Sequence, residues 1–464
     1  MSMCVIGRCM LWFVLGGSCL AAATGVRAER LTLPDLYGIS VGHDPAVKAA
    51  RAAVAAAAER LPQAQSQGLP QVILSADRFS NQLGMMSRQD RYESSNQTLQ
   101  IRQPLLRLGL AASIEQAVRA HDEAKALQEN AEQDLLSRLS GALFEHLLAM
   151  QQRDYVLALK LASSTQLQAA ERSLLAGSGV RTDVDEARAR LDAARAQELQ
   201  VQLQIEMTRR QLERLGGRSL GQFALLTVED PWNKEPALDA LTLWLERANN
   251  HPQLRALRAR AQAAQYEVTK AQSIDMPTVD AVARWTRSEG ENVFNSGGSY
   301  RNHQLGLQFN WPLYQGGASQ AAVREALARV DEAEHRLLAT RDELAQRLEG
   351  QFRLVQEGRS RIEALRQAAF SARQALVSSR RSFQAGSRTQ LDVLNAEQAL
   401  AQTARDLAQS RLSYLQAQLQ LALYAGLEPA QAMDRIRSWF SLVPAGPESK
   451  PFVAANSGWL GRSD

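Results

Sequence analysis

Apolar and polar side chains alternate along two separate parts of the chain, with the period of two residues that is typical of strands. In the second part the apolar positions are Val279, Ala281, Ala283 and Trp285, and then Leu305, Leu307, Phe309 and Trp311. The first part alternates less regularly. We predict strand hairpins at residues 71–104 and 278–312, with polar loops at 80–95 and 288–299. Strands of about ten residues are long enough to cross a bilayer when tilted.

The other long segments carry an apolar residue near every third or fourth position, which indicates helices. Residues 112–176 contain no proline and a single glycine, Gly141. They are predicted to form one helix about 100 Å long, at 1.5 Å per residue. The pattern predicts a second long helix at 319–384 and shorter helices at 183–215 and 391–425. A further helix precedes each strand hairpin, and the first is expected to bend at Pro62.

Two segments of the chain have similar sequences: RSLLAGSGVRTDVDEARARL at residues 172–191 and RSFQAGSRTQLDVLNAEQAL at residues 381–400. The copies lie about 209 positions apart, a spacing that indicates internal duplication. In each copy a Gly-Ser break ends a long helix and another helix starts a few residues later. We therefore predict two helical hairpin tips, at residues 177–182 and 385–391.

The duplication divides the chain into two structural repeats, residues 29–236 and 237–428. Each repeat runs helix, strand hairpin, long helix, tip and returning helix, and a connector at residues 216–236 closes the first. Residues 429–464 form a C-terminal tail with several prolines among small and polar residues. This tail is expected to be partly disordered.

The first 28 residues have the pattern of an export signal. Arg8 precedes an apolar run at residues 9–20, and Val26-Arg27-Ala28 offers a small-residue cleavage site. Two alternatives stay open: a membrane anchor, although the run is shorter than the ~20 residues of a span, and lipidation at Cys19. All three cysteines lie in this segment, so the mature chain is expected to hold no disulfide and no thiolate metal site.

Composition excludes several classes of function. Aromatic residues make up only 6% of the chain, and the net charge of +4 is too small to favour nucleic acid as a partner. No later segment is apolar for long enough to form a transmembrane helix. The chain contains no phosphate loop, nucleophile elbow or HExxH motif, and its histidines lack ligand spacing. We therefore expect no enzyme activity, no cofactor and no bound metal.

Four strands cannot close a barrel, and an open strand edge in lipid leaves backbone groups unpaired. If the strands lie in a membrane, the chain must form an oligomer. Closed barrels begin at about eight strands, so two copies are the minimum and three give a wider barrel. An ordinary coiled-coil rod with two hairpins is the alternative, but it does not explain the strand alternation.

Three short motifs carry a resemblance to a known family: Leu313-Tyr314-Gln315-Gly316-Gly317, Thr182-Asp183-Val184, and Gly386-Ser387-Arg388-Thr389 with Asp392-Val393-Leu394. In this order, within a duplicated chain, they resemble the TolC family of outer-membrane efflux and type I secretion channels. The resemblance implies a mainly α-helical fold with a small transmembrane β portion. It implies a homotrimer, in which a 12-stranded barrel in the outer membrane continues into an α-helical periplasmic tunnel.

The resemblance also assigns roles at the tips. Arg388 matches an arginine that links to Thr182 and Asp183 on the adjacent hairpin and holds the channel shut. Phe383 stands where the family prototype has a tyrosine. Asp392 matches a carboxylate facing the pore, where three copies would form an acidic ring and raise their own proton affinity.

The tip residues Gly177, Ser178, Gly386 and Ser387 would dock a periplasmic adaptor. Each role has a plainer alternative. Asp183 and Asp392 are also placed to cap helices, and Gly177 and Gly386 to permit left-handed turns.

The implied function is an exit duct in the outer membrane of a Gram-negative bacterium, extending into the periplasm and contacting outer-membrane lipid. Cargo would arrive from an inner-membrane ABC exporter or proton-driven pump through the adaptor. Type I protein secretion is the favoured role. Small-molecule efflux is the alternative, and an envelope scaffold or adhesin is less favoured.

Overall fold

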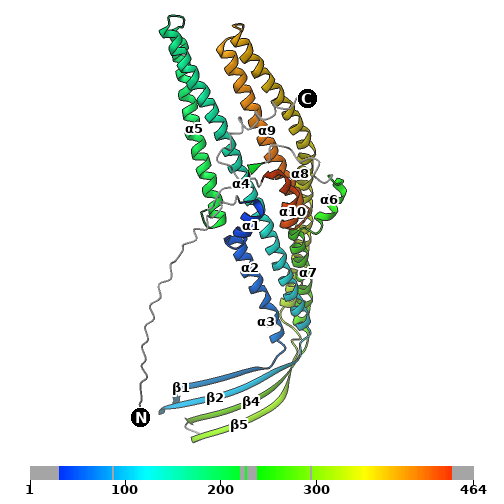
Figure 1. The fold of residues 1–464 in the computed structure, drawn as a ribbon. Coiled ribbons are helices and arrows are strands. Elements are labelled where there is room, and N and C mark those ends of the chain that lie inside the picture. Colours follow the sequence, from blue (N-terminus) through cyan, green and yellow to red (C-terminus); the bar gives the residue numbers. More distant parts are fainter. Residues whose placement is uncertain (1–30, 86–87, 220–224, 227–237, 293–294, 442–464) are drawn as a thin grey trace, which may run out of the picture.

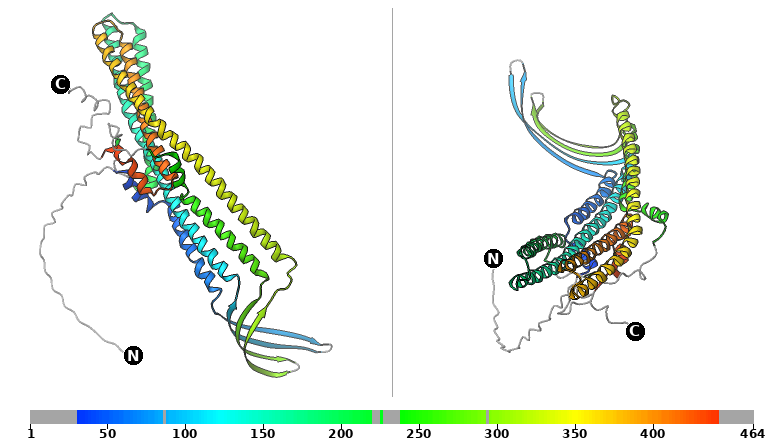
Figure 2. Two further views of the ribbon diagram at one scale, coloured as in Figure 1. Left: turned by 90° about the vertical axis from the view of Figure 1, so that its right-hand side faces the viewer. Right: turned by 90° about the horizontal axis from the view of Figure 1, so that it is seen from above.

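The computed structural model describes residues 31–85, 88–219, 225–226, 238–292 and 295–441. The predicted export signal, most of the connector and the last 23 residues of the tail lie outside these ranges. The molecule is elongated, with a curved sheet at one end and two helical hairpins at the other (Figures 1 and 2). Short helices pack around the long ones between these two ends.

The sheet is antiparallel and has the order β1-β2-β4-β5. Its strands are β1 (Gln71–Met85), β2 (Arg88–Leu106), β4 (Thr278–Asn292) and β5 (Asn295–Asn310). The register aligns Val72, Ile101, Ala283 and Leu305 in one row across all four strands. Directly opposed residues in such a ladder share a face, so this row is an apolar band across the whole sheet. The side chains of Val72 and Leu305 are 64% and 87% exposed in the single chain.

The strands are longer than the sequence pattern indicated. The polar stretches 80–95 and 288–299, which were predicted to be loops, continue the ladders almost to the turns. Polar side chains pair across the strands here: the Asn81 amide donates to Ser94 Oγ at 2.8 Å, and Arg78 forms an ion pair with Glu93. Backbone pairing does not require apolar side chains, so alternation alone underestimated the strand lengths.

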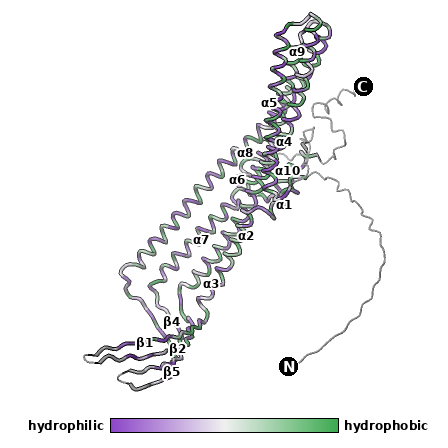
Figure 3. The backbone as a smooth tube through the Cα atoms, turned by 90° about the vertical axis from the view of Figure 1, so that its left-hand side faces the viewer, coloured by the Kyte–Doolittle hydropathy of each residue, from purple (hydrophilic) through white to green (hydrophobic). Residues whose placement is uncertain are grey.

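Two long helices, α4 (Leu110–Leu175) and α8 (Ala318–Gln384), run from the sheet to the tips. The helices α5 (Arg181–Gly216) and α9 (Gln390–Tyr424) return from the tips and end partway along. In the tip half the order is α5, α4, α9, α8 (Figure 1). Among the described residues, no helix is apolar over a length sufficient to cross a membrane. Figure 3 shows polar and apolar positions mixed along all four helices.

Shorter helices lead into each strand hairpin. They are α1 (Leu33–Val41), α2 (Pro45–Ala58) and α3 (Arg60–Ser66) in the first repeat, and α6 (Leu241–Ala248) and α7 (Pro252–Gln272) in the second. The break between α2 and α3 falls at Glu59, just before Pro62. The ring of a proline clashes with the carbonyl four residues earlier, here that of Ala58, so the helix is interrupted at that point.

Equivalent caps start α2 and α7. The Asp44 carboxylate accepts hydrogen bonds from the backbone N–H groups of Ala46 and Val47 at 2.9 and 3.1 Å. In the second repeat, Nδ1 of His251 accepts from the Gln253 N–H at 3.2 Å. Burial lowers the pKa of His251 to about 4, so the ring stays neutral at physiological pH and its nitrogen can accept. A carboxylate and an imidazole thus perform the same capping role.

The largest buried cluster lies where the short helices meet the long ones. The first part of the tail contributes α10 (Pro429–Ile436), η3 (Arg437–Trp439) and β6 (Phe440–Ser441). Trp439 is 1% exposed and its ring lies 5.7 Å from that of Tyr414. Strand β6 pairs with β3 (Leu225–Leu226), a short strand in the connector. Residues 429–441 are therefore ordered, because their apolar side chains fill this core. The rest of the tail, which was expected to be partly disordered, lies outside the described residues.

Candidate gate at the hairpin tips

The two hairpins end in turns of the same construction. Gly177 has φ +74° and Gly386 has φ +76°, a left-handed conformation that glycine adopts without steric cost. The N–H of Ser178 donates to the Ser173 carbonyl at 3.0 Å, and the N–H of Ser387 donates to the Ser382 carbonyl at 2.9 Å. Bonds of this kind satisfy the last carbonyls of a helix after a left-handed glycine. The local sequence therefore determines both turns without help from neighbours.

The four residues predicted to dock an adaptor lie at the far ends of these turns. The hydroxyls of Ser178 and Ser387 donate to the same carbonyls as their backbone N–H groups, at 3.3 and 3.0 Å. A Cβ built on Gly177 or Gly386 would meet no atom within 4 Å. The serines therefore stabilise the turns, and the glycines present open backbone surface that another protein can approach.

Arg388 lies against its own hairpin. Its guanidinium donates to Ser379 Oγ at 2.9 Å, and Ser379 is 2% exposed on α8. Thr182 and Asp183 are exposed at the start of α5. Within the described part of a single chain, no hydrogen bond or ion pair joins Arg388 to either residue. The link suggested by the resemblance is thus not made inside one chain.

The first tip has no room for a residue like Arg388. Gly179 occupies the equivalent position, and a Cβ there would lie 2.9 Å from the Leu174 nitrogen and 3.0 Å from the Ser173 carbonyl carbon. Side-chain carbons are essentially never found that close to backbone atoms. An arginine latch can therefore be carried by the second tip and not by the first.

Asp392 caps α9. Thr389 and Asp392 form a capping box, in which Thr389 Oγ1 and N donate to Asp392 Oδ2 at 2.8 and 2.9 Å. These bonds, together with nearby Arg388, lower the pKa of Asp392. This lowering is that of the single chain, whereas the rise expected from a ring of three carboxylates concerns an assembled oligomer. In the first repeat Val180 stands in place of Thr389, so Asp183 has no such box.

Phe383 lies in the last turn of α8 and is 42% exposed. It has no hydroxyl to donate, and the carbonyl of this residue accepts from the Gly386 N–H at 2.9 Å. Its exposed ring is available to pack against another chain.

One further pair of contacts was not anticipated from the sequence. Arg188 of α5 pairs with Glu171 of α4 at 3.3 Å, and Arg380 of α8 pairs with Glu397 of α9 at 2.7 Å. The two pairs occupy equivalent positions in the repeats, with the charges exchanged. Aligning the repeats over their full length would have exposed this reversal, because each residue has its counterpart 209 positions away.

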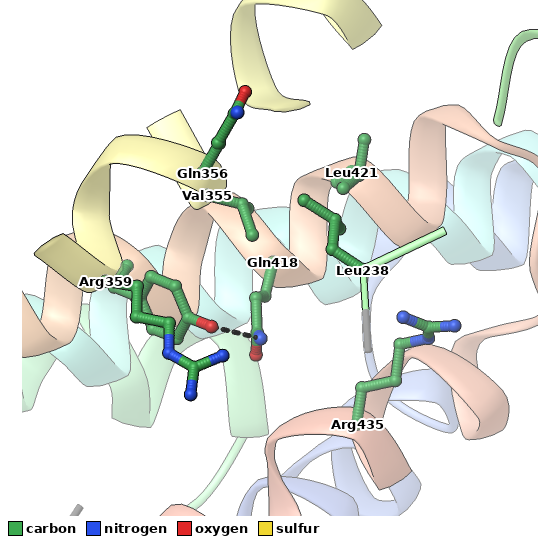
Figure 4. A pocket seen from close by; sticks show the side chains of 8 residues that line it. Leu238, Val355, Gln356, Arg359, Gln418, Leu421 and Arg435 are labelled. Atoms are coloured by element: carbon green, nitrogen blue, oxygen red, sulfur yellow. Dashed lines mark hydrogen bonds between the residues drawn. The ribbon is translucent and has the colours of Figure 1, made fainter. Parts of the chain in front are cut away.

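A cavity of about 210 Å³ lies away from the tips, where α8, α9 and α10 meet. Figure 4 shows its lining, with the Gln418 amide donating to the Tyr414 hydroxyl at 2.8 Å. The lining residues are Leu238, Val355, Gln356, Arg359, Tyr414, Gln418, Leu421 and Arg435. None of them is a carboxylate, a histidine or a thiol.

Two halves of the chain, residues 36–218 and 245–427, match the model of the family described as outer membrane efflux protein. The chain belongs to this family. The matched segments are the two structural repeats, each with its strand hairpin and helical hairpin. The chain is accordingly an outer-membrane channel protein that extends into the periplasm, and not an enzyme.

Relatives cover most of the chain. It is 31% identical to the proteases secretion protein PrtF of Dickeya chrysanthemi, over 76% of this chain and 77% of that protein. It is 30% identical to the alkaline protease secretion protein AprF of Pseudomonas aeruginosa, over 86% and 85%. The outer membrane protein TolC of Salmonella enteritidis is 27% identical, over 95% and 91%.

Solved structures show the same fold. CusC aligns with a TM-score of 0.73 at 17% identity, covering 88% of this chain and 96% of that one. The Campylobacter jejuni outer membrane channel CmeC aligns with the same TM-score at 15% identity, covering 88% of each chain. Sequence and fold together support an outer-membrane exit duct.

Proposed function

We propose that this duct serves type I protein secretion, in which an inner-membrane ABC exporter passes a protein through a periplasmic adaptor into the channel. One observation carries the proposal: the two relatives at 30% identity or above are both named for the secretion of proteases. They cover 76% and 86% of this chain. A duct for small molecules is the second candidate, because the cobalt-zinc-cadmium resistance protein CzcC is 26% identical over 66% of the chain.

The working unit in this proposal is a homotrimer. Strands β1 and β5 are the edges of the sheet, each paired on one side only, and an unpaired edge in lipid costs several kcal/mol per backbone group. Copies joined β5 to β1 around an axis satisfy both edges. The apolar band through Val72 and Leu305 would then face lipid, with the polar face turned inward.

The closed state of the gate depends on contacts between hairpins. Arg388 leaves Ser379 and reaches Thr182 and Asp183 of an adjacent hairpin, where its planar fork can bond several acceptors at once. Phe383 packs beside this link in place of a hydroxyl contact. Asp392 lines the narrowest part of the pore, where three copies attract cations.

Deleting the gene in its own host tests the choice of cargo. For a protein secretion duct, one or more large proteins disappear from the culture medium and accumulate in the cells, while drug and metal tolerance is unchanged. The opposite pattern would support small-molecule efflux. Planar-bilayer recordings of the purified protein test the duct itself, and an assembled oligomer without conductance contradicts it.

A further inference from the structure

Two arginines face each other on the second strand hairpin, two rows beyond the apolar band in the direction of the turn. The register places Arg287 of β4 directly opposite Arg301 of β5, and both side chains are exposed. They share the face of Ala283 and Leu305, because each lies an even number of residues away along its strand. Like charges directly opposed across a ladder destabilise it. This pair therefore requires negative charge nearby.

The described chain supplies only part of that negative charge. Arg287 forms an ion pair with Glu289 of its own strand at 2.5 Å. Glu93, a carboxylate of β2 on the same face, is already paired with Arg78. Among the described residues, no ion pair or hydrogen bond joins Arg301 to a carboxylate. The two opposed arginines thus share one carboxylate.

Joining copies of the chain does not supply the missing charge. In the homotrimer of the proposed function, β5 pairs with β1 of the next copy, so Arg301 has β1 as its second neighbour. Every second residue of β1 lies on the face of the apolar band. These residues are Val72, Leu74, Ala76, Arg78, Ser80 and Gln82. None of them is a carboxylate, so β1 adds no negative charge beside Arg301 in any register.

The level of the arginine pair matches one boundary of the apolar layer of a membrane. Trp311 directly follows β5, and Trp285 lies in the row next to the pair; tryptophans gather at the two membrane interfaces. From Trp311 to Arg301 the chain runs ten residues, about 34 Å at 3.4 Å per residue. At a tilt of about 40° this length spans about 26 Å, and the apolar band of such barrels is about 25 Å tall. The pair therefore lies at the depth of lipid headgroups.

These headgroups belong to the outer leaflet. The long helices begin at the foot of the sheet and extend into the periplasm, so the turns of the strand hairpins lie at the outer side (Figure 1). The outer leaflet of an outer membrane presents phosphorylated glycolipids. A phosphate offers several acceptor oxygens, and the planar fork of a guanidinium binds such oxygens through paired hydrogen bonds. Arg287 and Arg301 thus have the charge, the depth and the donor geometry for this headgroup.

We propose that Arg287 and Arg301 together bind a phosphate of a glycolipid headgroup in the outer leaflet. The phosphate supplies the negative charge that the opposed arginines lack. The acyl chains of the same lipid lie along the apolar band beneath, where Leu305 and Leu307 are 87% and 74% exposed in the single chain. The inference rests on the homotrimer of the proposed function, because only a closed barrel turns this face toward lipid.

Titration of the purified oligomer with a defined glycolipid tests the site. The oligomer in dodecyl maltoside micelles is titrated with lipid A that carries two phosphates, and bound lipid is counted by native mass spectrometry. The double variant Arg287→Gln with Arg301→Gln should bind this lipid about tenfold more weakly or worse, the factor expected from losing one charge-assisted hydrogen bond. The single variant Arg301→Gln should lose part of this affinity, and it decides the test by the same comparison if the double variant does not assemble.

The matched control is Arg284→Gln. Arg284 is an exposed arginine of the same strand, but it lies on the opposite face of the sheet, where its guanidinium donates to Gln100 Oε1 at 3.0 Å. In the closed barrel this face is turned away from lipid, so the control should bind lipid A like the parent. Unchanged binding in the Arg287 and Arg301 variants, or an equal loss in Arg284→Gln, overturns the proposal.

Further probes identify the chemistry that is recognised. Lipid A without its phosphates should bind the parent as weakly as intact lipid A binds the double variant. Equal binding with and without phosphates would mean that the apolar band alone holds the lipid. Displacement of lipid A by equimolar inorganic phosphate would mean a free-anion site, and equal binding of phosphatidylglycerol would mean a site for any anionic lipid. Each of these three results overturns the proposal.

Bilayer conductance of the same samples separates this proposal from the proposed function. A conducting oligomer whose lipid A binding does not depend on Arg287 and Arg301 refutes the lipid site and leaves the duct intact. An assembled oligomer without conductance refutes the duct, whatever lipid it binds.

Discussion

Arg388 donates a hydrogen bond to Ser379 of its own hairpin at 2.9 Å. A gate built on Arg388 is therefore an exchange of partners: the guanidinium leaves a serine hydroxyl inside one chain for Thr182 and Asp183 on an adjacent hairpin. The closed state gains an ionised carboxylate in place of a neutral hydroxyl, and a guanidinium–carboxylate pair can form two parallel hydrogen bonds between opposite charges. The open state is not left with an unpaired cation, since Ser379 is there to accept.

Arg388→Ser is expected to raise the conductance of the reconstituted channel. A hydrogen bond to a charged group contributes about 1.5–3 kcal/mol, and each 1.4 kcal/mol shifts an equilibrium about tenfold. The open state also loses its bond to Ser379, so the closed state should lose population by the difference between the two contacts, roughly several-fold. Single-channel recordings measure this change. Arg381→Ser, an exposed arginine of the same turn, serves as the control and should conduct like the parent; unchanged conductance in Arg388→Ser would remove its assigned role.

Thr389→Val converts the second tip to the arrangement of the first, where Val180 stands at the same position. The change removes the capping box around Asp392, and loss of such a cap costs about 1 kcal/mol. Hydrogen exchange at the start of α9 should become faster by about fivefold, the factor that 1 kcal/mol produces. Thr182→Val, whose side chain is exposed and makes no cap bond, should leave exchange in α5 unchanged. Equal exchange in both variants and the parent would contradict the capping role.

Acidification should weaken the second tip through Asp392. Its pKa is lowered below the usual 3.8, chiefly by hydrogen bonds from Thr389. A carboxyl with a lowered folded-state pKa contributes stability that is fully present above its unfolded value and is lost as the pH falls through the folded value. Exchange at residues 389–392 should therefore accelerate below pH 3.8. Asp392→Asn should abolish that dependence; an identical pH profile in this variant would refute the assignment.

Gly179→Ala should destabilise the first tip, because the new Cβ would lie 2.9 Å from the Leu174 nitrogen. The backbone must shift to accommodate it, at a cost of about 1–3 kcal/mol as for other overpacked sites. Gly141→Ala is the matched control, since its Cβ meets nothing within 4 Å inside α4. That change should be neutral or stabilise by about 0.5–1 kcal/mol. Thermal unfolding of the two variants compares them directly, and equal midpoints would contradict the steric argument.

Short sequence patterns predicted the order of helices and strands, because the residues within each element largely determine whether it forms a helix, a strand or a turn. The alternation at Val279, Ala281 and Ala283 predicted a strand, and the two similar segments at residues 172–191 and 381–400 predicted the helical hairpin tips. The predicted strands were too short at the turn end of the hairpin. The polar ladder through Asn81 and Ser94 shows no alternation of apolar and polar residues that could have indicated strand there. Residues 429–441 are held in an ordered conformation by contacts such as that between the rings of Trp439 and Tyr414. This contact joins the tail to helix α9, so a local sequence pattern does not predict it.

The tips show the same division between local and nonlocal information. Their glycines, the capping role considered for Asp392 and the break between helices follow from short motifs. The partner of Arg388 does not, because Ser379 is one of several serines in α8 and nothing in the local pattern singles it out.

The reversed ion pairs, Glu171 with Arg188 and Arg380 with Glu397, record how the two repeats diverged. A duplication begins with identical halves, so each of these two positions has changed in at least one of the hairpins since then. Changing either residue alone would have left two like charges facing each other across a hairpin. A chimaeric hairpin that joins α4 to α9 would bring Glu171 and Glu397 together, and these two like charges would repel each other across the hairpin.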